Sequence, residues 1–223
     1  MREAFRLLLS GDGETWGIVA RSVRFSFLST VFALLPGVPL GIALALGRFP
    51  GKRIIVSVVN AMTAVPTVVI GLVVYTAISR SGPMGNLGWL FAPTGVVLGQ
   101  TCLALPVVTA LSYTGLAKLD PRFHETLTTL GAKGPLRLLA TIREARPVLI
   151  AAAVTAFGRV TGEVGVSMML GGNIRHLTRT MTTAIALDAA KGDFERALSL
   201  GVVLLLIALA VNLILHLLTD PGV

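Results

Sequence analysis

Residues 25–47 form the stretch FSFLSTVFALLPGVPLGIALALG, which contains no charged side chain. About 20 residues of α-helix, each rising 1.5 Å, cross the hydrocarbon core of a bilayer, so this stretch predicts a transmembrane helix. The composition of the whole chain agrees. Hydrophobic residues make up 54% of its 223 residues and charged residues 13%, whereas soluble domains have roughly 25% charged residues. A soluble globular protein is therefore excluded.

Similar apolar segments follow along the rest of the chain, and together they predict an all-α, polytopic membrane protein with a single transmembrane domain over residues 1–223. The mixed segment 171–195 contains one further short helix, around residues 182–190. The predicted transmembrane helices cover about residues 20–47, 54–79, 94–117, 147–169 and 197–218.

Proline and glycine recur inside these predicted spans. In a membrane bundle, neighbouring helices can satisfy the backbone groups that a proline frees, so we expect kinked and closely packed helices. Glycines four residues apart allow helices to approach closely, although glycine is also simply common in membrane helices. The prolines are Pro36, Pro39, Pro66 and Pro106, and the glycine pairs are Gly37/Gly41, Gly95/Gly99 and Gly158/Gly162.

The net charge of +8 lies in short islands between apolar segments, which is typical of membrane loops and not of a nucleic-acid-binding surface. The cations divide equally between the two sets of loops, so their count does not orient the chain. Their density in residues 48–53 and 118–146 favours the cytoplasm for those loops. The N-terminus is then outside, with residues 1–17 as an outer interfacial segment, and the C-terminus is cytoplasmic. Trp16 and Trp89 would lie near the outer interface.

The connection 118–146 is unusually long for a minimal bundle. Asp120-Pro121 predicts a helix start, Gly131 predicts its end, and a second helix begins after Gly134-Pro135. Two helices in a charged loop favour a docking platform for another protein. The alternative is a helix pair that lies on lipid headgroups.

This loop resembles the EAA loop of permease subunits of ATP-binding-cassette (ABC) importers. Glu125 and Gly131 stand at the separation that the EAA pattern requires, with Thr126 and Leu127 in its alanine places. The resemblance extends over about residues 8–218 to the molybdate/tungstate group of these permeases, and most of all to the tungstate-specific ones. It is carried by GRFPGKR (47–53), SRSGPMG (79–85), ALPVVTAL (104–111), GEVGVSMMLGGNI (162–174), TRTMTTAIAL (178–187) and KGDFERAL (191–198).

The resemblance implies the MetI-like fold of a type I ABC importer. It also implies a homodimer of five-span subunits in the plasma (inner) membrane of a prokaryote, which imports an oxyanion, most specifically tungstate, by alternating access. An extracytoplasmic oxyanion-binding protein would deliver the substrate, and two cytoplasmic ATPase subunits would dock on the loops. The implied docking residues are His124, Glu125, Thr126, Leu127 and Gly131.

The sequence contains no catalytic motif. It has no G-x-x-x-x-G-K-[ST] loop, so ATP and magnesium are expected in the partner ATPase, and no cofactor is expected in this chain. Its single cysteine, Cys102, and scattered histidines predict no metal site. An ion-coupled transporter or channel that acts without an ATPase is the alternative function, although no internal repeat supports it. A membrane-embedded enzyme is the third hypothesis.

Arg159 and Glu163 are ionisable residues inside a predicted span, where an unpaired charge costs roughly 2.5–3.5 kcal/mol. Four residues apart on one helix they would share a face, so we expect an ion pair that braces the bundle or the dimer seam. The alternative places them beside the translocation path, together with Gly162 and Gly165. An unpaired Glu163 would repel an oxyanion, so Arg159 is not predicted to bind the substrate.

The connection after the fourth predicted span forms a candidate outer-mouth loop. Asn173, Arg175 and Arg179 could give it a positive surface that attracts an oxyanion or an acidic docking face. A merely solvated loop is the alternative.

Overall fold

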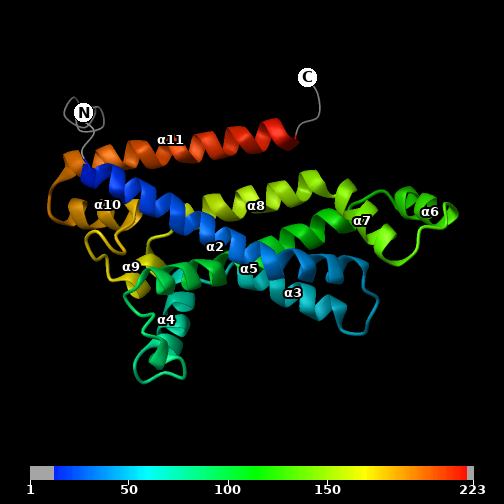
Figure 1. The fold of residues 1–223 in the computed structure, drawn as a ribbon, viewed down its shortest axis with the longest axis horizontal. Coiled ribbons are helices and arrows are strands. Elements are labelled where there is room, and N and C mark those ends of the chain that lie inside the picture. Colours follow the sequence, from blue (N-terminus) through cyan, green and yellow to red (C-terminus); the bar gives the residue numbers. More distant parts are fainter. Residues whose placement is uncertain (1–12, 220–223) are drawn as a thin grey trace.

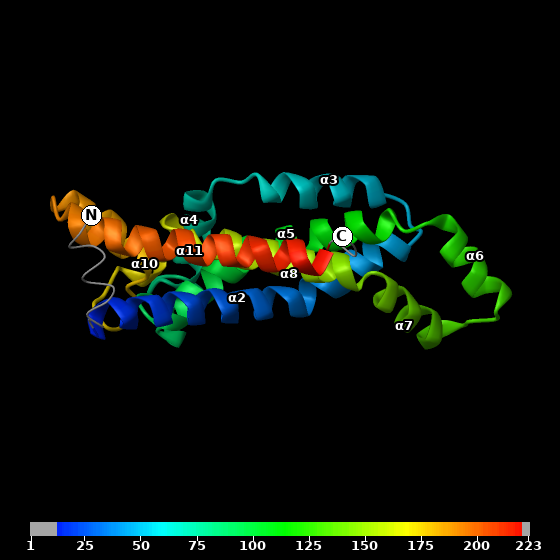
Figure 2. The same ribbon diagram turned by 90° about the horizontal axis from the view of Figure 1, so that it is seen from above.

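The computed structural model describes residues 13–219, and the regular elements in this range are helices. The long helices run roughly along one axis, with α10 and the start of α2 at one end and α6 and α7 at the other (Figures 1 and 2). We call these the α10 end and the α6 end. The elements are α2 (Gly13–Leu46), α3 (Lys52–Thr63), α4 (Thr67–Ile78), the 3₁₀ helix η1 (Gly85–Leu87), α5 (Pro93–Ala117), α6 (Pro121–Thr129), α7 (Gly134–Glu144), α8 (Arg146–Thr161), α9 (Gly165–Gly171), α10 (Met181–Ala190) and α11 (Phe194–Thr219).

Three helices, α2, α5 and α11, are each long and apolar enough to cross a membrane. The pairs α3–α4 and α8–α9 meet the same criterion only together, and they are bent by 99° and 63°. The chain therefore has up to five candidate spans. Each of the predicted spans 54–79 and 147–169 is divided into two helices, which is a sharper bend than the kinks expected from proline and glycine. The first helix begins at Gly13, so residues 13–17 belong to α2, and the rest of the predicted interfacial segment lies outside the described residues.

Proline explains the first break but does not break every helix. Pro66 lacks a backbone N–H and its ring would clash with a preceding carbonyl, and it stands between α3 and α4 with φ −56° and ψ 132°. This break turns α4 away from the bundle (Figure 1). Pro36 and Pro39 stay inside α2, and Pro106 stays inside α5. The sequence therefore marks where a break is possible, and tertiary packing decides where one forms.

Glycines bring α2 against α5. A Cβ added at Gly37 would lie 2.8 Å from Val108 Cγ1, and one at Gly41 would lie 2.5 Å from Ser112 Cβ. Only glycine permits this approach, so the close helix contact that the spacing of this pair allows is formed. Gly158 is different, because the nearest atom to its added Cβ is 3.9 Å away. The α8 helix does pack against α11, but there is room for a side chain at Gly158, so this contact does not require glycine.

Two hydrophobic clusters hold the helices together. The larger lies at the crossing of α2, α4, α5, α8 and α9, and the smaller joins α2, α10 and α11 at the α10 end. Outside them, α11 leaves one side of its length exposed, including Leu205, Leu209 and Leu213. Exposed aliphatic faces of this kind suit contact with lipid or with another membrane helix.

Candidate functional site

The loop between α5 and α8 forms a helical hairpin at the α6 end (Figure 1). Asp120 begins it, because its Oδ1 accepts a hydrogen bond of 2.9 Å from the Arg122 backbone N–H. Gly131 follows α6 with φ +72°, a conformation that favours glycine, and the chain then turns into α7. The two helices predicted for this loop are confirmed.

The hairpin presents both polar and apolar side chains. Glu125 and Thr126 are exposed and Leu127 is half-buried, whereas the side chain of His124 lies outside the described residues. Leu130 is 75% exposed, and α7 adds Leu136 and Leu139, which are 62% and 51% exposed. Charged helices with uncovered leucines suit contact with another protein or with lipid headgroups.

Arg159 lies near the end of α8 and binds a different helix. Its Nη2 donates a hydrogen bond of 3.2 Å to the carbonyl oxygen of Thr63, the last residue of α3. A guanidinium at this point satisfies a carbonyl that has no partner within its own helix and suits the negative end of the helix dipole. Arg159 therefore stabilises the break between α3 and α4.

Glu163 also supports a helix end. Its buried Oε1 accepts a hydrogen bond of 3.1 Å from the Val166 N–H in the first turn of α9, and its backbone carbonyl accepts one of 2.8 Å from Thr182 Oγ1. The predicted ion pair with Arg159 is wrong, because none of the ion pairs among the described residues joins them. The helix between them ends at Thr161, so the four-residue spacing no longer places them on one face.

The two helix breaks lie side by side. A Cβ added at Gly165 would lie 3.2 Å from both Glu163 Oε1 and Thr67 Oγ1, which connects the start of α9 to the start of α4. Gly162 is exposed between α8 and α9. The predicted set Arg159, Gly162, Glu163 and Gly165 therefore gathers where four helix ends meet. Irregular backbone at membrane depth is tolerated only where it is buried in protein or lines a water-filled cavity.

A buried polar cluster next to this region was not predicted. Gln100 on α5 accepts a 3.0 Å hydrogen bond from Ser29 Oγ on α2 and donates one of 3.1 Å to Ser167 Oγ on α9. The only available signal was an amide side chain in the apolar stretch 94–117. Because each polar atom has a partner, the cluster fixes the register of three helices.

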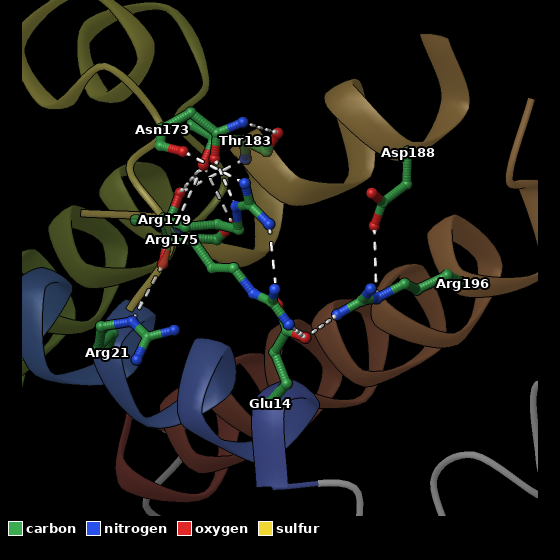
Figure 3. A network of polar contacts seen from close by, with 9 residues as sticks. Glu14, Arg21, Asn173, Arg175, Arg179, Thr183, Asp188 and Arg196 are labelled. Atoms are coloured by element: carbon green, nitrogen blue, oxygen red, sulfur yellow. Dashed lines mark hydrogen bonds and ion pairs between the residues drawn. The ribbon is translucent and has the colours of Figure 1, made fainter. Parts of the chain in front are cut away.

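The outer-mouth residues belong to a charge network at the α10 end (Figure 3). Glu14 at the start of α2 forms ion pairs with Arg175, with Arg179 at 3.8 Å and with Arg196 at 3.0 Å. Arg196 also reaches Asp188 on α10 at 3.8 Å. The network joins α2, the 172–180 connection, α10 and α11. It therefore holds these elements together at the α10 end.

Asn173 holds the connection inside this network. Its Oδ1 accepts a 3.2 Å hydrogen bond from Arg179 Nε, and its Nδ2 donates one of 3.2 Å to the carbonyl of Thr183. The structure thus brings together the predicted Asn173, Arg175 and Arg179. No local pattern indicated Glu14 as their common partner, because Glu14 stands more than 150 residues away in the chain. Arg175 remains 60% exposed.

No group of three or more His, Cys, Asp or Glu side chains that could hold a metal occurs among residues 13–219.

Comparison with known proteins adds three findings. Residues 37–220 match the family model described as "Binding-protein-dependent transport system inner membrane component". The chain is 36% identical to the "Tungstate uptake system permease protein TupB" of Peptoclostridium acidaminophilum, over 96% of this chain and 94% of the relative. It is 41% identical to the protein of the same name from Campylobacter jejuni subsp. jejuni serotype O:2, over 96% of this chain and 90% of the relative.

The fold also matches a solved structure, an inward-facing conformation of the MetNI methionine ABC transporter. The TM-score is 0.68 at 18% identity, and the match covers 93% of this chain and 95% of the solved chain. The predicted MetI-like, all-α architecture is therefore confirmed.

Proposed function

Because the chain belongs to the family of binding-protein-dependent transport system inner membrane components, we propose that it is the subunit through which an ABC importer carries tungstate across the plasma membrane. The observation that carries this proposal is the similarity, over 96% of the chain, to two tungstate uptake permeases. The chain itself is a transport component without catalytic activity, and ATP hydrolysis belongs to a separate subunit. ATP and magnesium bind in that subunit, and this chain needs no cofactor.

Two copies of the chain enclose the path, and alternating access moves the substrate along it. The paired breaks around Arg159, Gly162, Glu163 and Gly165 support this part of the proposal, since they interrupt two apolar spans at one place. The α4 helix supports it as well. It turns away from the bundle and leaves Val69 and Leu72 about half exposed, at 48% and 52%, which suits a contact with a second copy.

The α6–α7 hairpin transmits the motion of the ATPase to the helices. We assign this coupling role to His124, Glu125, Thr126, Leu127 and Gly131. The exposed leucines of the hairpin support docking, and the α7 helix leads directly into α8, which carries Arg159. An extracytoplasmic oxyanion-binding protein delivers tungstate at the α10 end, near Asn173, Arg175 and Arg179.

The α6 end faces the cytoplasm and the N-terminus lies outside. Arg48, Lys52 and Arg137 line one hollow at the α6 end, so the two basic loops lie together, in agreement with the positive-inside rule. In a Cys102→Ala background, Thr129→Cys should resist a membrane-impermeant maleimide in intact cells, whereas Asn86→Cys should react. The opposite labelling pattern would show that the α6 end faces the outside and would contradict this orientation.

Uptake by cells tests the assignment of tungstate as the substrate. The chain, its ATPase and its binding protein are expressed in a host that lacks tungstate uptake, and intracellular tungsten is measured by mass spectrometry. We expect accumulation that requires all three proteins and persists with a hundredfold excess of sulfate. If sulfate or phosphate suppresses uptake as effectively as unlabelled tungstate, the assigned substrate is wrong.

A further inference from the structure

A hollow lies beside α2 near the α10 end, apart from the paired helix breaks. It has a volume of about 840 Å³ and is bounded by α2, the start of α5 and the connections that precede α5 and α10. We propose that it binds an anionic phospholipid, with the headgroup at Arg21 and Arg24 and an acyl chain along α2 and α5. The proposal does not depend on which solute the chain transports.

The apolar part of the hollow has the length of one bilayer leaflet. On α2 its lining follows one helical stripe, from Arg21 through Phe25 and Leu28 to Phe32, which spans about 16 Å at 1.5 Å per residue. Half of the hydrocarbon core of a bilayer is about 15 Å thick. An acyl chain lying on this stripe would therefore reach from the interface to the middle of the membrane.

The cationic rim lies at the level expected for lipid headgroups. Trp89 lines the same hollow as Arg21 and Arg24, together with His176. Tryptophan gathers at the membrane–water interface, and arginine near the end of a span extends its guanidinium toward that interface. The hollow thus combines an interfacial anchor, a cationic rim and an apolar channel.

The two arginines at this rim form no direct ion pair among the described residues, although the Glu14 carboxylate is close enough to attract Arg21. Arg175, Arg179 and Arg196 share Glu14. Arg21 meets the network only through its Nε, which donates a 3.4 Å hydrogen bond to the backbone carbonyl of Arg179 (Figure 3).

Arg21 Nη2 is a buried donor without a hydrogen-bond partner among the described residues, and no ion pair of the described residues includes Arg24. A buried guanidinium donor without a hydrogen-bond acceptor lowers the stability of the fold. A phosphodiester offers the anionic acceptor oxygens that this donor lacks.

The remaining lining favours a lipid over a free anion. Below the rim the hollow is bordered mainly by aliphatic and aromatic side chains, and Phe32 and Leu177 are 51% and 45% exposed. A free phosphate ion would satisfy the arginines but leave this apolar surface uncovered. A phospholipid matches both parts at once.

Native mass spectrometry of the full-length, delipidated protein in detergent tests the proposal. Phosphatidylglycerol and phosphatidylcholine with identical acyl chains are titrated separately. We expect tighter binding of phosphatidylglycerol, and about fivefold weaker binding of it by the Arg24→Gln variant, since a single cation near the surface contributes roughly that factor. Arg24→Lys should retain binding. Arg80→Gln is the matched control, because Arg80 is exposed and does not line the hollow.

Arg24 is exposed, so its substitution should leave the fold intact, and thermal unfolding in detergent checks this. Equal binding of the two lipids, or equal losses for Arg24→Gln and Arg80→Gln, would overturn the proposal. So would full displacement of phosphatidylglycerol by millimolar inorganic phosphate, which would identify a free-anion site. A change in oligomeric state with unchanged lipid binding would assign the hollow to a second copy instead.

Discussion

Arg159 and Glu163 illustrate how a residue's role depends on where its helix ends. Their spacing predicts an ion pair, but α8 stops between them and each side chain supports a different helix end. Arg159 binds the last carbonyl of α3, and Glu163 binds an N–H in the first turn of α9. Both satisfy backbone groups that a broken membrane helix leaves without partners.

A double-mutant cycle tests this separation. Arg159→Ala and Glu163→Ala should each lower the free energy of unfolding by about 1 kcal/mol, since each removes the partner of a helix end. Their effects should add to within about 0.5 kcal/mol, because the two side chains do not contact each other. Thermal unfolding of the single and double variants in detergent measures both quantities. A larger interaction free energy between the two substitutions would instead support an ion pair between Arg159 and Glu163.

Glu163→Gln gives a matched control for the capping role. Its amide oxygen can still accept the hydrogen bond from the Val166 N–H, so this variant should lose less stability than Glu163→Ala. If the two variants are equally destabilised in the same unfolding measurement, the charge of Glu163, and not its acceptor oxygen, is what the fold needs.

At the scale of helices, the sequence predicts local features well and long-range partners poorly. The hairpin of α6 and α7 follows from Asp120-Pro121 and Gly131, because capping and turn chemistry act over a few residues. The break at Pro66 does not follow from proline alone, since Pro106 stays within α5. The ion pairs of Glu14 depend on the complete tertiary fold, which no local pattern describes.

The contact between α2 and α5 gives a prediction for glycine. Gly41→Ala would place a Cβ 2.5 Å from Ser112 Cβ and 3.0 Å from the Thr109 carbonyl oxygen. We expect it to lower the free energy of unfolding by about 1–3 kcal/mol, because the helices must separate. Gly158→Ala is the control, since its nearest neighbour would be 3.9 Å away. Unfolding in detergent should leave that variant unchanged or stabilised, and equal losses would exclude close packing as the cause.

The hairpin of α6 and α7 gives a prediction for coupling. Leu130→Asp adds a charge at a side chain that is 75% exposed, so stability should change by less than about 0.5 kcal/mol. Binding of the purified ATPase should weaken at least about fivefold if Leu130 is central to the docking surface. Leu87→Asp in η1, where Leu87 is 50% exposed, is the matched control and should bind normally. ATPase binding that is unaffected by Leu130→Asp would contradict this docking surface.

At the scale of the whole molecule, composition was enough to predict a membrane protein, and the apolar segments predicted five spans, which is the upper number that the structure allows. Kinks were predictable from the prolines and glycines, but the sharp bends within two of those spans were not, because they depend on side chains from other helices that satisfy the broken ends. The same bends place polar groups inside the bundle. The paired helix breaks, to which we assign a role in transport, are therefore the region where the structure departs from a bundle of straight helices.

Uptake of tungstate by proteoliposomes tests the central claim, which is that this chain provides a path driven through the α6–α7 hairpin by a separate ATPase. The chain is reconstituted with its binding protein, with and without the ATPase, and tungstate inside the vesicles is measured over time. We predict uptake only when the ATPase and ATP are both present. Tungstate uptake of the same rate by the chain without its ATPase would contradict the account.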